Sequence, residues 1–349
     1  MLNRIANKFS KFVERYLPDA FVIAVLMTLF VLLIGFFMNP TEPKTLFTSF
    51  GNGFWAYLAF TMQMVLLLMT GMALASVPVI QRLLTALASK AKTANQAYVL
   101  TFLVASAAYY INWGLAVVVG AIIAREVGKR NKQAHFPLLV ASAYTPTVLY
   151  TAGFSSSIGL TVATDGHFLE SVMGVIPTSQ TIFHPGTFII LLTLLITVPL
   201  FIVLMAPKKD IISYNPPTLK QNRTPESETN SSSPALRLEN TPILGMIIGA
   251  IGIIYIVIEF VGGRDLDLNI INLIFLSLGL FLHRSLGQYA KAFKEAASAI
   301  SPIILQFPFY AGIIAVLGSS GIAESIINGM ASIANEQTFS VFSYWTAGL

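Results

Sequence analysis

The 349-residue sequence contains no cysteine, and only 11% of its residues are Asp, Glu, Lys or Arg. Without cysteine the protein has neither disulfides nor thiolate metal sites. Soluble domains carry about 25% charged residues, so this low charge, with 55% hydrophobic residues, indicates an all-α polytopic membrane protein. The net charge of +5 does not indicate a nucleic-acid partner, because the basic residues lie between the apolar segments.

Ionisable side chains are also missing from the middle of the expected spans. Glu126, Glu259 and Glu295 lie only at span ends, so a proton relay through buried carboxylates has little support. The four histidines are scattered over loops and span ends: His135, His167, His184 and His283. Since they lack metal-ligand spacing, we interpret them as interfacial and expect no metal site or other cofactor.

Basic residues between the apolar runs orient the expected spans, because such residues favour the cytoplasmic side. Residues 1–20 are expected to form a cytoplasmic interfacial helix. The first membrane half then covers 21–206 and contains two segments expected to be outer loops, 39–53 and 161–185. The turn 262–269 in the second half is also expected to lie outside. The expected simple spans are 21–38, 54–77, 186–206, 243–261, 270–282 and 301–317.

The apolar stretch 97–125 is too long for one ordinary span, and it has a polar interruption at residues 112–114. Basic residues flank it at both ends, such as Lys92 before it and Arg125 after it. Both ends are therefore expected on the cytoplasmic side. This predicts a re-entrant hairpin with its tip near residue 112; one long tilted helix with a kinked middle is the alternative.

A second interruption divides the span expected over 138–163. Gly153 and Gly159 bracket a run of three hydroxyl side chains. The serines in that run are Ser155, Ser156 and Ser157. Irregular backbone at membrane depth must be covered by protein or line a wet cavity, so a broken helix is expected here. The alternative is a packing surface of small residues, which is also our interpretation of the GxxxG pair Gly245 and Gly249.

The two breaks together form the candidate site for substrate and ion. Asn112 can both accept and donate hydrogen bonds, Trp113 follows it, and Gly114 lets the backbone turn closely. Helix N-termini at such breaks can hold a carboxylate without a cationic side chain, while carbonyl and hydroxyl oxygens suit sodium. A membrane-embedded acyl hydrolase that uses one of the serines is a rival hypothesis, although no G-x-S-x-G motif occurs.

An internal repeat underlies the two halves. Polar residues recur 13 positions apart in two apolar segments: Gln63, Ser76 and Ser89 in the first, Gln306, Ser319 and Ser332 in the second. The expected orientations of the two segments are opposite, as in the inverted repeats of secondary transporters. Gln63 and Gln306 are therefore candidates to support a second half-site.

A hydrophilic segment, 207–241, separates the halves and is expected to be a flexible cytoplasmic linker, because it includes the low-complexity run ESETNSSS. The second membrane half covers 242–349. After Ser332 it offers only Phe339 to Leu349 where the first half continues into its hairpin. We therefore expect an incomplete second repeat, and an inactive truncated remnant is an alternative.

Several motifs resemble the short-chain fatty acid transporter family of bacterial inner membranes. They are RYLPDAFVIAVLMT, GFWAYLAFTMQM, INWGLAVVVGAIIAREV, HFPLLVASAY, GFSSSIGL, VIPTSQTIF and QFPFYAG. The resemblance implies a non-enzymatic secondary transporter of monocarboxylates such as acetoacetate or butyrate, coupled to Na⁺ or H⁺. It also implies a homodimer, with the hairpin tip and the broken helix forming half of the site. Another small carboxylate or an amino-acid-like substrate is the alternative cargo.

Overall fold

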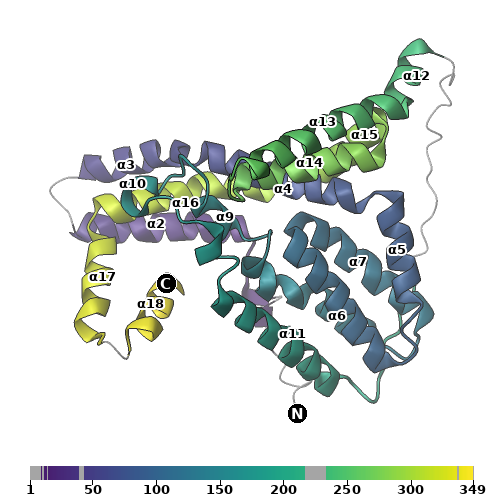
Figure 1. The fold of residues 1–349 in the computed structure, drawn as a ribbon. Coiled ribbons are helices and arrows are strands. Elements are labelled where there is room, and N and C mark those ends of the chain that lie inside the picture. The colour runs from purple at the N-terminus through teal and green to yellow at the C-terminus, as the bar shows by residue number, and fades with distance from the viewer. Residues whose placement is uncertain are drawn as a thin grey trace. The chain divides into compact units, whose positions relative to one another are not determined.

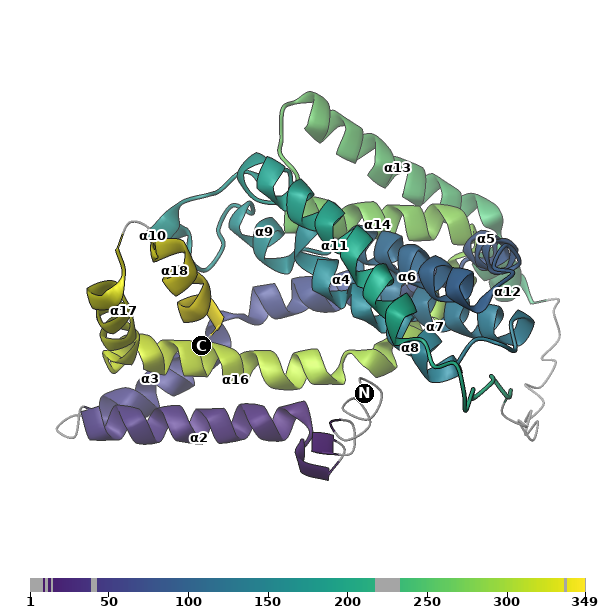
Figure 2. The same cartoon turned by 90° about the horizontal axis from the view of Figure 1, so that it is seen from below.

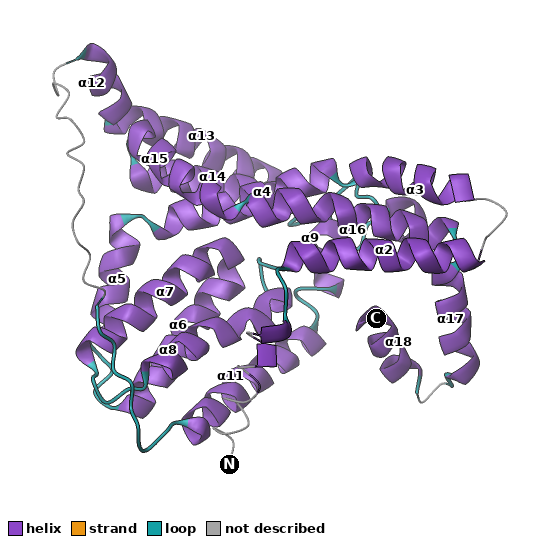
Figure 3. Ribbon diagram, turned by 180° about the vertical axis from the view of Figure 1, so that it is seen from behind, coloured by secondary structure: helices purple, strands orange, loops and turns teal. Residues whose placement is uncertain are grey.

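The computed structural model describes residues 9, 12–13, 15–38, 43–216, 233–335 and 338–348, which contain helices and loops but no strand (Figure 3). Five stretches in this part of the chain are long and apolar enough to cross a membrane. They are α2 (Ala20–Met38), the pair α3 (Pro43–Ala56) and α4 (Leu58–Ala75), α11 (Pro185–Met205), α13 (Pro242–Val261) and α16 (Ser301–Ser319). The expectation of an all-α polytopic membrane protein is confirmed. Most of the interfacial helix expected over 1–20 lies outside the described residues.

The chain divides into two compact units, and each is described by itself. The first contains residues 63–300, and the second contains the described residues of 11–62 and 301–349. The remaining helices of the first unit are α5 (Pro78–Ala88), α6 (Ala94–Ile111), α7 (Trp113–Arg130), α8 (Phe136–Tyr144), η1 (Thr145–Ala152), α9 (Ser157–Val162), α10 (Glu170–Met173), η2 (Thr178–Gln180), α12 (Pro234–Asn240), α14 (Leu268–His283), α15 (Leu286–Ala296) and η3 (Ala297–Ala299). The second unit adds α17 (Ile322–Ile333) and α18 (Phe339–Gly348).

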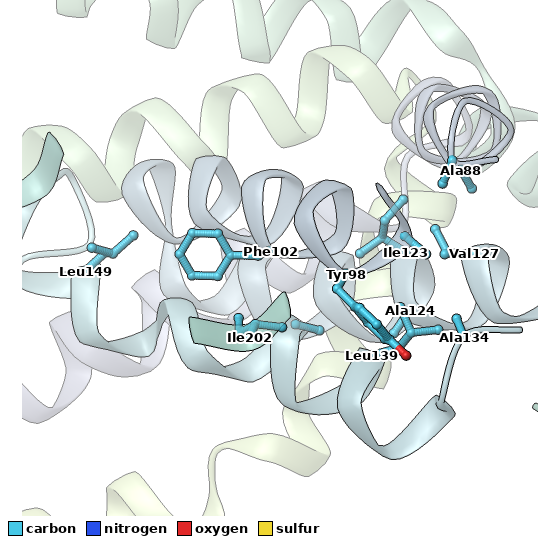
Figure 4. Close-up of a cluster of buried hydrophobic side chains, with 13 residues drawn as sticks. Ala88, Tyr98, Phe102, Ile123, Ala124, Val127, Ala134, Leu139, Leu149 and Ile202 are labelled. Carbon is cyan, nitrogen blue, oxygen red and sulfur yellow. The ribbon is translucent and has the colours of Figure 1, made fainter. Parts of the chain in front are cut away.

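In the first unit α6, α7 and α8 lie side by side, and α11 runs along them (Figures 1 and 2). Their shared core includes Tyr98, Phe102, Ile123 and Leu139, all fully buried (Figure 4). The start of α6 is fixed by a capping box, in which Thr93 and Gln96 satisfy each other's backbone N–H groups. The α6–α7 hairpin is thus packed into a helical bundle.

The glycines of α13 bring that helix close to α14. A Cβ atom added to Gly249 would lie 2.7 Å from the carbonyl oxygen of Ser277, and one added to Gly245 would overlap the Arg284 carbonyl group at the end of α14. Small residues let membrane helices approach at backbone distance. The interpretation of the GxxxG pair as a packing surface is therefore confirmed.

Helix α14 also runs along α4 in the same direction. The Gln63 side-chain amide donates to Asn269 Oδ1 at 2.8 Å near the start of the contact. At the other end, His283 Nε2 lies 2.8 Å from the carbonyl oxygen of Ala73. Two polar contacts at opposite ends therefore fix the register of these helices.

The second unit corrects the expected outer loop at 39–53. Residues 43–53 belong to α3, which packs on α16; residues 39–42 lie outside the described part. Pro43 is tolerated at the first helical position. A Cβ atom added to Gly53 would lie only 3.1 Å from the Ala311 carbonyl oxygen, so the missing side chain lets α3 approach α16 closely. Proline and glycine are typical of loops, but here Pro43 starts the helix and Gly53 permits its close packing.

Both described ends of the segment 207–241 make defined contacts, and the flexibility expected of this linker stays a prediction. Ile212 pairs with the loop before α8: Phe136 N–H donates to its carbonyl oxygen at 2.7 Å, and its own N–H donates to His135 Nδ1 at 3.1 Å. Lys132 Nζ donates to the Tyr214 carbonyl oxygen at 2.8 Å. At the far end, residues 234–240 form α12. Backbone hydrogen bonds thus order a segment with little apolar surface, whereas 217–232 lie outside the described residues.

The two copies of the proposed repeat have the same local structure. Helix α4 ends just before Ser76 and α16 ends at Ser319, and in each case the hydroxyl donates to a carbonyl oxygen three residues earlier. A shorter helix follows, α5 or α17, and the hydroxyls of Ser89 and Ser332 donate three residues back at 2.7 Å. The inverted orientation of the copies stays a prediction.

Candidate functional site

The tip of the α6–α7 hairpin is a single residue, Asn112. Its extended backbone (φ −163°, ψ 126°) ends α6, and its side-chain oxygen accepts the Leu115 N–H at 2.9 Å to cap α7. An asparagine at this position satisfies one of the free amides that every helix N-terminus leaves. Asn112 is completely buried, so its amide serves the backbone of the hairpin in this structure.

The tip rests on α4 at backbone distance. Asn112 Nδ2 donates to the Leu67 carbonyl oxygen at 3.0 Å. A Cβ atom on Gly71 would overlap the Asn112 amide, and one on Gly114 would overlap the Leu68 carbonyl group. The two glycines are therefore required for the contact, while the neighbouring Trp113 is half-buried.

The second break is hydrogen-bonded to the same tip. At the C-terminal end of α6 the carbonyl oxygens of Tyr109 and Tyr110 lack helical partners, as at every helix end. The Ser155 hydroxyl donates to the first, and the Phe154 N–H donates to the second at 2.8 Å. Gly153 packs against the Tyr110 carbonyl group with no room for a side chain. The hairpin tip and the broken helix thus form one hydrogen-bonded structure.

The remaining residues of the break build the start of α9. Ser156 caps that helix, because its hydroxyl oxygen accepts the Gly159 N–H at 3.1 Å. Ser157 is the first helical residue and is half-buried, and its carbonyl oxygen accepts the Thr161 hydroxyl. Within the described chain, the hydrogen-bond partners found for Ser155 and Ser156 are backbone groups, not a histidine or a carboxylate. This arrangement contains no activated nucleophile.

Two pockets flank the break. The first, the Arg264 pocket, has a volume of about 510 Å³. Its walls come from the tip, the break, the segment after η2, the end of α13 with the turn that follows it, and one face of α14. The lining residues are Ile111, Phe154, Phe183, Phe260, Arg264, Asp265, Leu266, Ile271, Ile274, Phe275 and Leu278. The second, the Ser156 pocket, has about 280 Å³ and includes Ser156, Gly159 and Thr181. The Thr181 hydroxyl is buried there and has no hydrogen-bond partner among the described residues. The volume of the Arg264 pocket is in the usual range for small-molecule sites.

Charged groups meet at the polar end of the Arg264 pocket. Arg264 forms ion pairs with Glu259 at 2.9 Å and Asp267 at 2.8 Å, which raise the pKa of its guanidinium above the ordinary value. Burial alone would raise the pKa of the Asp265 carboxyl, but hydrogen bonds from the Thr178 hydroxyl and from the Thr178 and Leu266 amides outweigh it and lower that pKa. Asp265 and Arg264 are therefore both held in their charged forms.

The two glutamines proposed as support lie in different units and make different contacts. Gln63 bonds to Asn269, and its carbonyl oxygen accepts the Asn272 amide at 3.1 Å. Gln306 Oε1 accepts the Tyr310 hydroxyl at 3.1 Å within α16. Their role as part of a second half-site stays a prediction.

Sequence reasoning missed Arg264 and the contacts of His283. Arg264 follows two glycines in a turn expected to lie outside the membrane, and nothing local marks it as facing a pocket. His283 was expected at an interface, but it is 8% exposed and contacts α4 and Tyr289. The described residues contain no group of three or more His, Asp or Glu side chains that could hold a metal ion.

Comparisons with known proteins agree with the motif resemblance. The model of the family described as "Short chain fatty acid transporter" matches residues 1–349. A protein of Escherichia coli strain K12, provisionally named a short-chain fatty acid transporter, is 38% identical over 352 residues, which cover 100% of this chain and 80% of that protein. A Haemophilus influenzae protein with the same provisional name is 35% identical over 357 residues, 99% of this chain and 80% of its own length. No solved structure matches the chain.

Proposed function

The chain belongs to the short-chain fatty acid transporter family, and we propose that it carries short monocarboxylates such as butyrate or acetoacetate across the bacterial inner membrane. The observation that carries this proposal is the hydrogen-bonded contact between the hairpin tip and the broken helix, with a largely apolar pocket beside it. Paired breaks of this kind are where secondary transporters bind their cargo. Apolar walls suit the aliphatic chain of such an acid.

Contacts between loops support the proposed topology. The amide and hydroxyl of Thr178 bond to Asp265 at 2.7 and 2.6 Å, and both residues lie in segments expected outside. On the side expected to be cytoplasmic, Lys132 bonds to Tyr214, and Ser285 to the Glu239 carbonyl oxygen at 2.9 Å. Each contact joins segments assigned to the same side. The proposal places the N-terminus in the cytoplasm, by the distribution of basic residues.

Two further parts of the proposal rest on the family resemblance and on the pattern of repeats. The carrier couples transport to an ion, Na⁺ or H⁺, and it works as a homodimer. The matched local structure of α4–α5 and α16–α17 supports a repeat-based transporter.

Uptake by purified protein in liposomes tests the function. Radiolabelled butyrate should accumulate in vesicles containing the wild-type chain, and unlabelled acetoacetate should compete. Ile274→Trp adds bulk inside the Arg264 pocket and should stop uptake. Ile196→Trp makes the same change at an exposed residue of α11 and is the matched control.

Two results would contradict the proposal. The folded protein could accumulate succinate or alanine but no monocarboxylate, which would favour the alternative cargo. Equal butyrate uptake by the wild-type and Ile274→Trp proteins would show that the Arg264 pocket is not on the transport route.

A further inference from the structure

The Arg264 pocket combines apolar walls with a small charged cluster. Nine of its eleven lining side chains are Ile, Leu or Phe, and the other two are Arg264 and Asp265. Transfer of an ionised carboxylate from water into such surroundings is strongly unfavourable unless an opposite charge compensates it. The charge at the polar end therefore decides which form of an acid fits.

The cluster is negative overall. Arg264 contributes one positive charge, but Glu259 and Asp267 pair with it directly and Asp265 lines the pocket beside it. One positive and three negative groups sum to −2. An ionised substrate would add a further negative charge to a site where its own desolvation already opposes binding.

A protonated acid avoids both costs and still finds partners. The guanidinium has five N–H groups, and three of them bond to described residues: Nε–H and one Nη2–H to Asp267, and one Nη1–H to Glu259. One N–H on each terminal nitrogen remains for the carbonyl oxygen of an acid. The acid O–H can donate to a carboxylate oxygen of the cluster, and the aliphatic chain can contact the phenylalanines.

We infer that the Arg264 pocket binds the short-chain acid in its uncharged, protonated form, so that each acid molecule carries one proton with it. The inference rests on the proposed function and selects H⁺ as the coupling ion. The proton binds to the carboxylate oxygen in the solution on one side of the membrane and dissociates from it in the solution on the other side. Among the described residues, the titratable groups that line the pocket are Arg264 and Asp265, and Glu259 and Asp267 pair with Arg264; none needs to relay the proton.

Competition binding to the full chain in lipid nanodiscs tests this inference. Aliphatic carboxyls titrate at about pH 4–5, so the apparent affinity for butyrate should fall about 100-fold between about pH 5.5 and about pH 7.5. Butyramide, which is uncharged at both values, should compete equally well at both. This control separates protonation of the ligand from protonation of the protein. Butanesulfonate, which stays ionised, should compete at neither pH value.

A charge variant sharpens the test. Glu259→Gln keeps an oxygen that can accept from Arg264 but removes one negative charge, so it should raise the affinity for butanesulfonate relative to butyramide. Glu295→Gln removes the same charge at an exposed position of α15 and should not change that ratio. Butyrate binding independent of pH, or competition by butanesulfonate comparable to that by butyrate, would overturn the inference alone. Absence of butyrate binding at both pH values would overturn the proposed function as well.

Discussion

Asn112 Nδ2 donates a hydrogen bond to the Leu67 carbonyl oxygen over 3.0 Å, and this bond holds the tip of the α6–α7 hairpin against α4. The contact exists because Gly71 has no side chain where the Asn112 amide lies. The same asparagine caps α7 through Leu115. One buried side chain thus sets both the bend of the hairpin and its distance from α4.

Replacement of Gly71 by alanine should break this contact. The added Cβ would displace the Asn112 amide, and overpacking of a tight contact costs about 1–3 kcal/mol. The variant should lose thermal stability in detergent and most of its butyrate uptake. Gly51→Ala is the control, since nothing lies within 4 Å of the added atom in α3; it should be neutral or stabilising by up to about 1 kcal/mol. Equal stability of the two variants would show that the tip does not depend on α4.

Alanine substitutions of the three serines of the break should destabilise the protein to different degrees. Ser155→Ala leaves the buried Tyr109 carbonyl oxygen without its donor and should cost about 1–3 kcal/mol. Ser156→Ala removes the cap of α9 and should cost about 1 kcal/mol. Ser157→Ala should change stability by less than about 0.5 kcal/mol. Thermal unfolding and uptake measure the series, and a fluorophosphonate probe should label none of the three serines.

Labelling of single cysteines should place both ends of the hairpin on one side. The chain has no native cysteine, so Lys92→Cys and Gln133→Cys need no background substitutions. Both positions are exposed, and they flank α6 and α7. An impermeant maleimide should reach both from the same side and should reach Asp165→Cys, in a loop expected outside, from the other. Labelling of the first two positions from opposite sides would exclude a re-entrant hairpin.

Acid should break one of the hydrogen bonds that hold the segment around Ile212 against the loop before α8. His135 Nδ1 accepts the Ile212 N–H and must be neutral to do so, and burial lowers the pKa of His135 below its ordinary value. A lowered pKa in the folded state means that this bond stabilises above about pH 6.5. The stabilisation is lost as the pH falls through the lowered value.

Hydrogen exchange at the Ile212 amide checks this pH dependence. Its protection factor should fall on acidification. The Thr178 amide is the internal control, because the Asp265 carboxylate that holds it has a lowered pKa and stays ionised at mildly acidic pH. A parallel loss of protection at both amides would indicate general unfolding instead.

The helices and the breaks could be predicted from local sequence because their causes are local. An apolar run of about 20 residues predicts a membrane helix, and Asn112 and Gly153–Gly159 interrupt such runs with groups that end helices. The helix at 43–53 was missed because proline and glycine occur both in loops and at helix starts or close contacts. At Gly53 the deciding fact is the presence of α16.

By itself the sequence determined the membrane class of this protein, its family and the position of its two breaks, because hydropathy, charge placement and motifs are properties of short segments. Only the tertiary structure decided what the breaks contact. The Asn112 side chain is hydrogen-bonded to α4 and α7, and the Ser155 hydroxyl is hydrogen-bonded to the end of α6. Both bonds form because unpaired carbonyl and amide groups at helix ends bond to the nearest partner in space. Arg264 faces the pocket because the end of α6 and one face of α14 line it together, which brings residues more than 100 positions apart, such as Ile111 and Phe275, to one place. No pattern within a single segment predicts that these distant residues line one pocket.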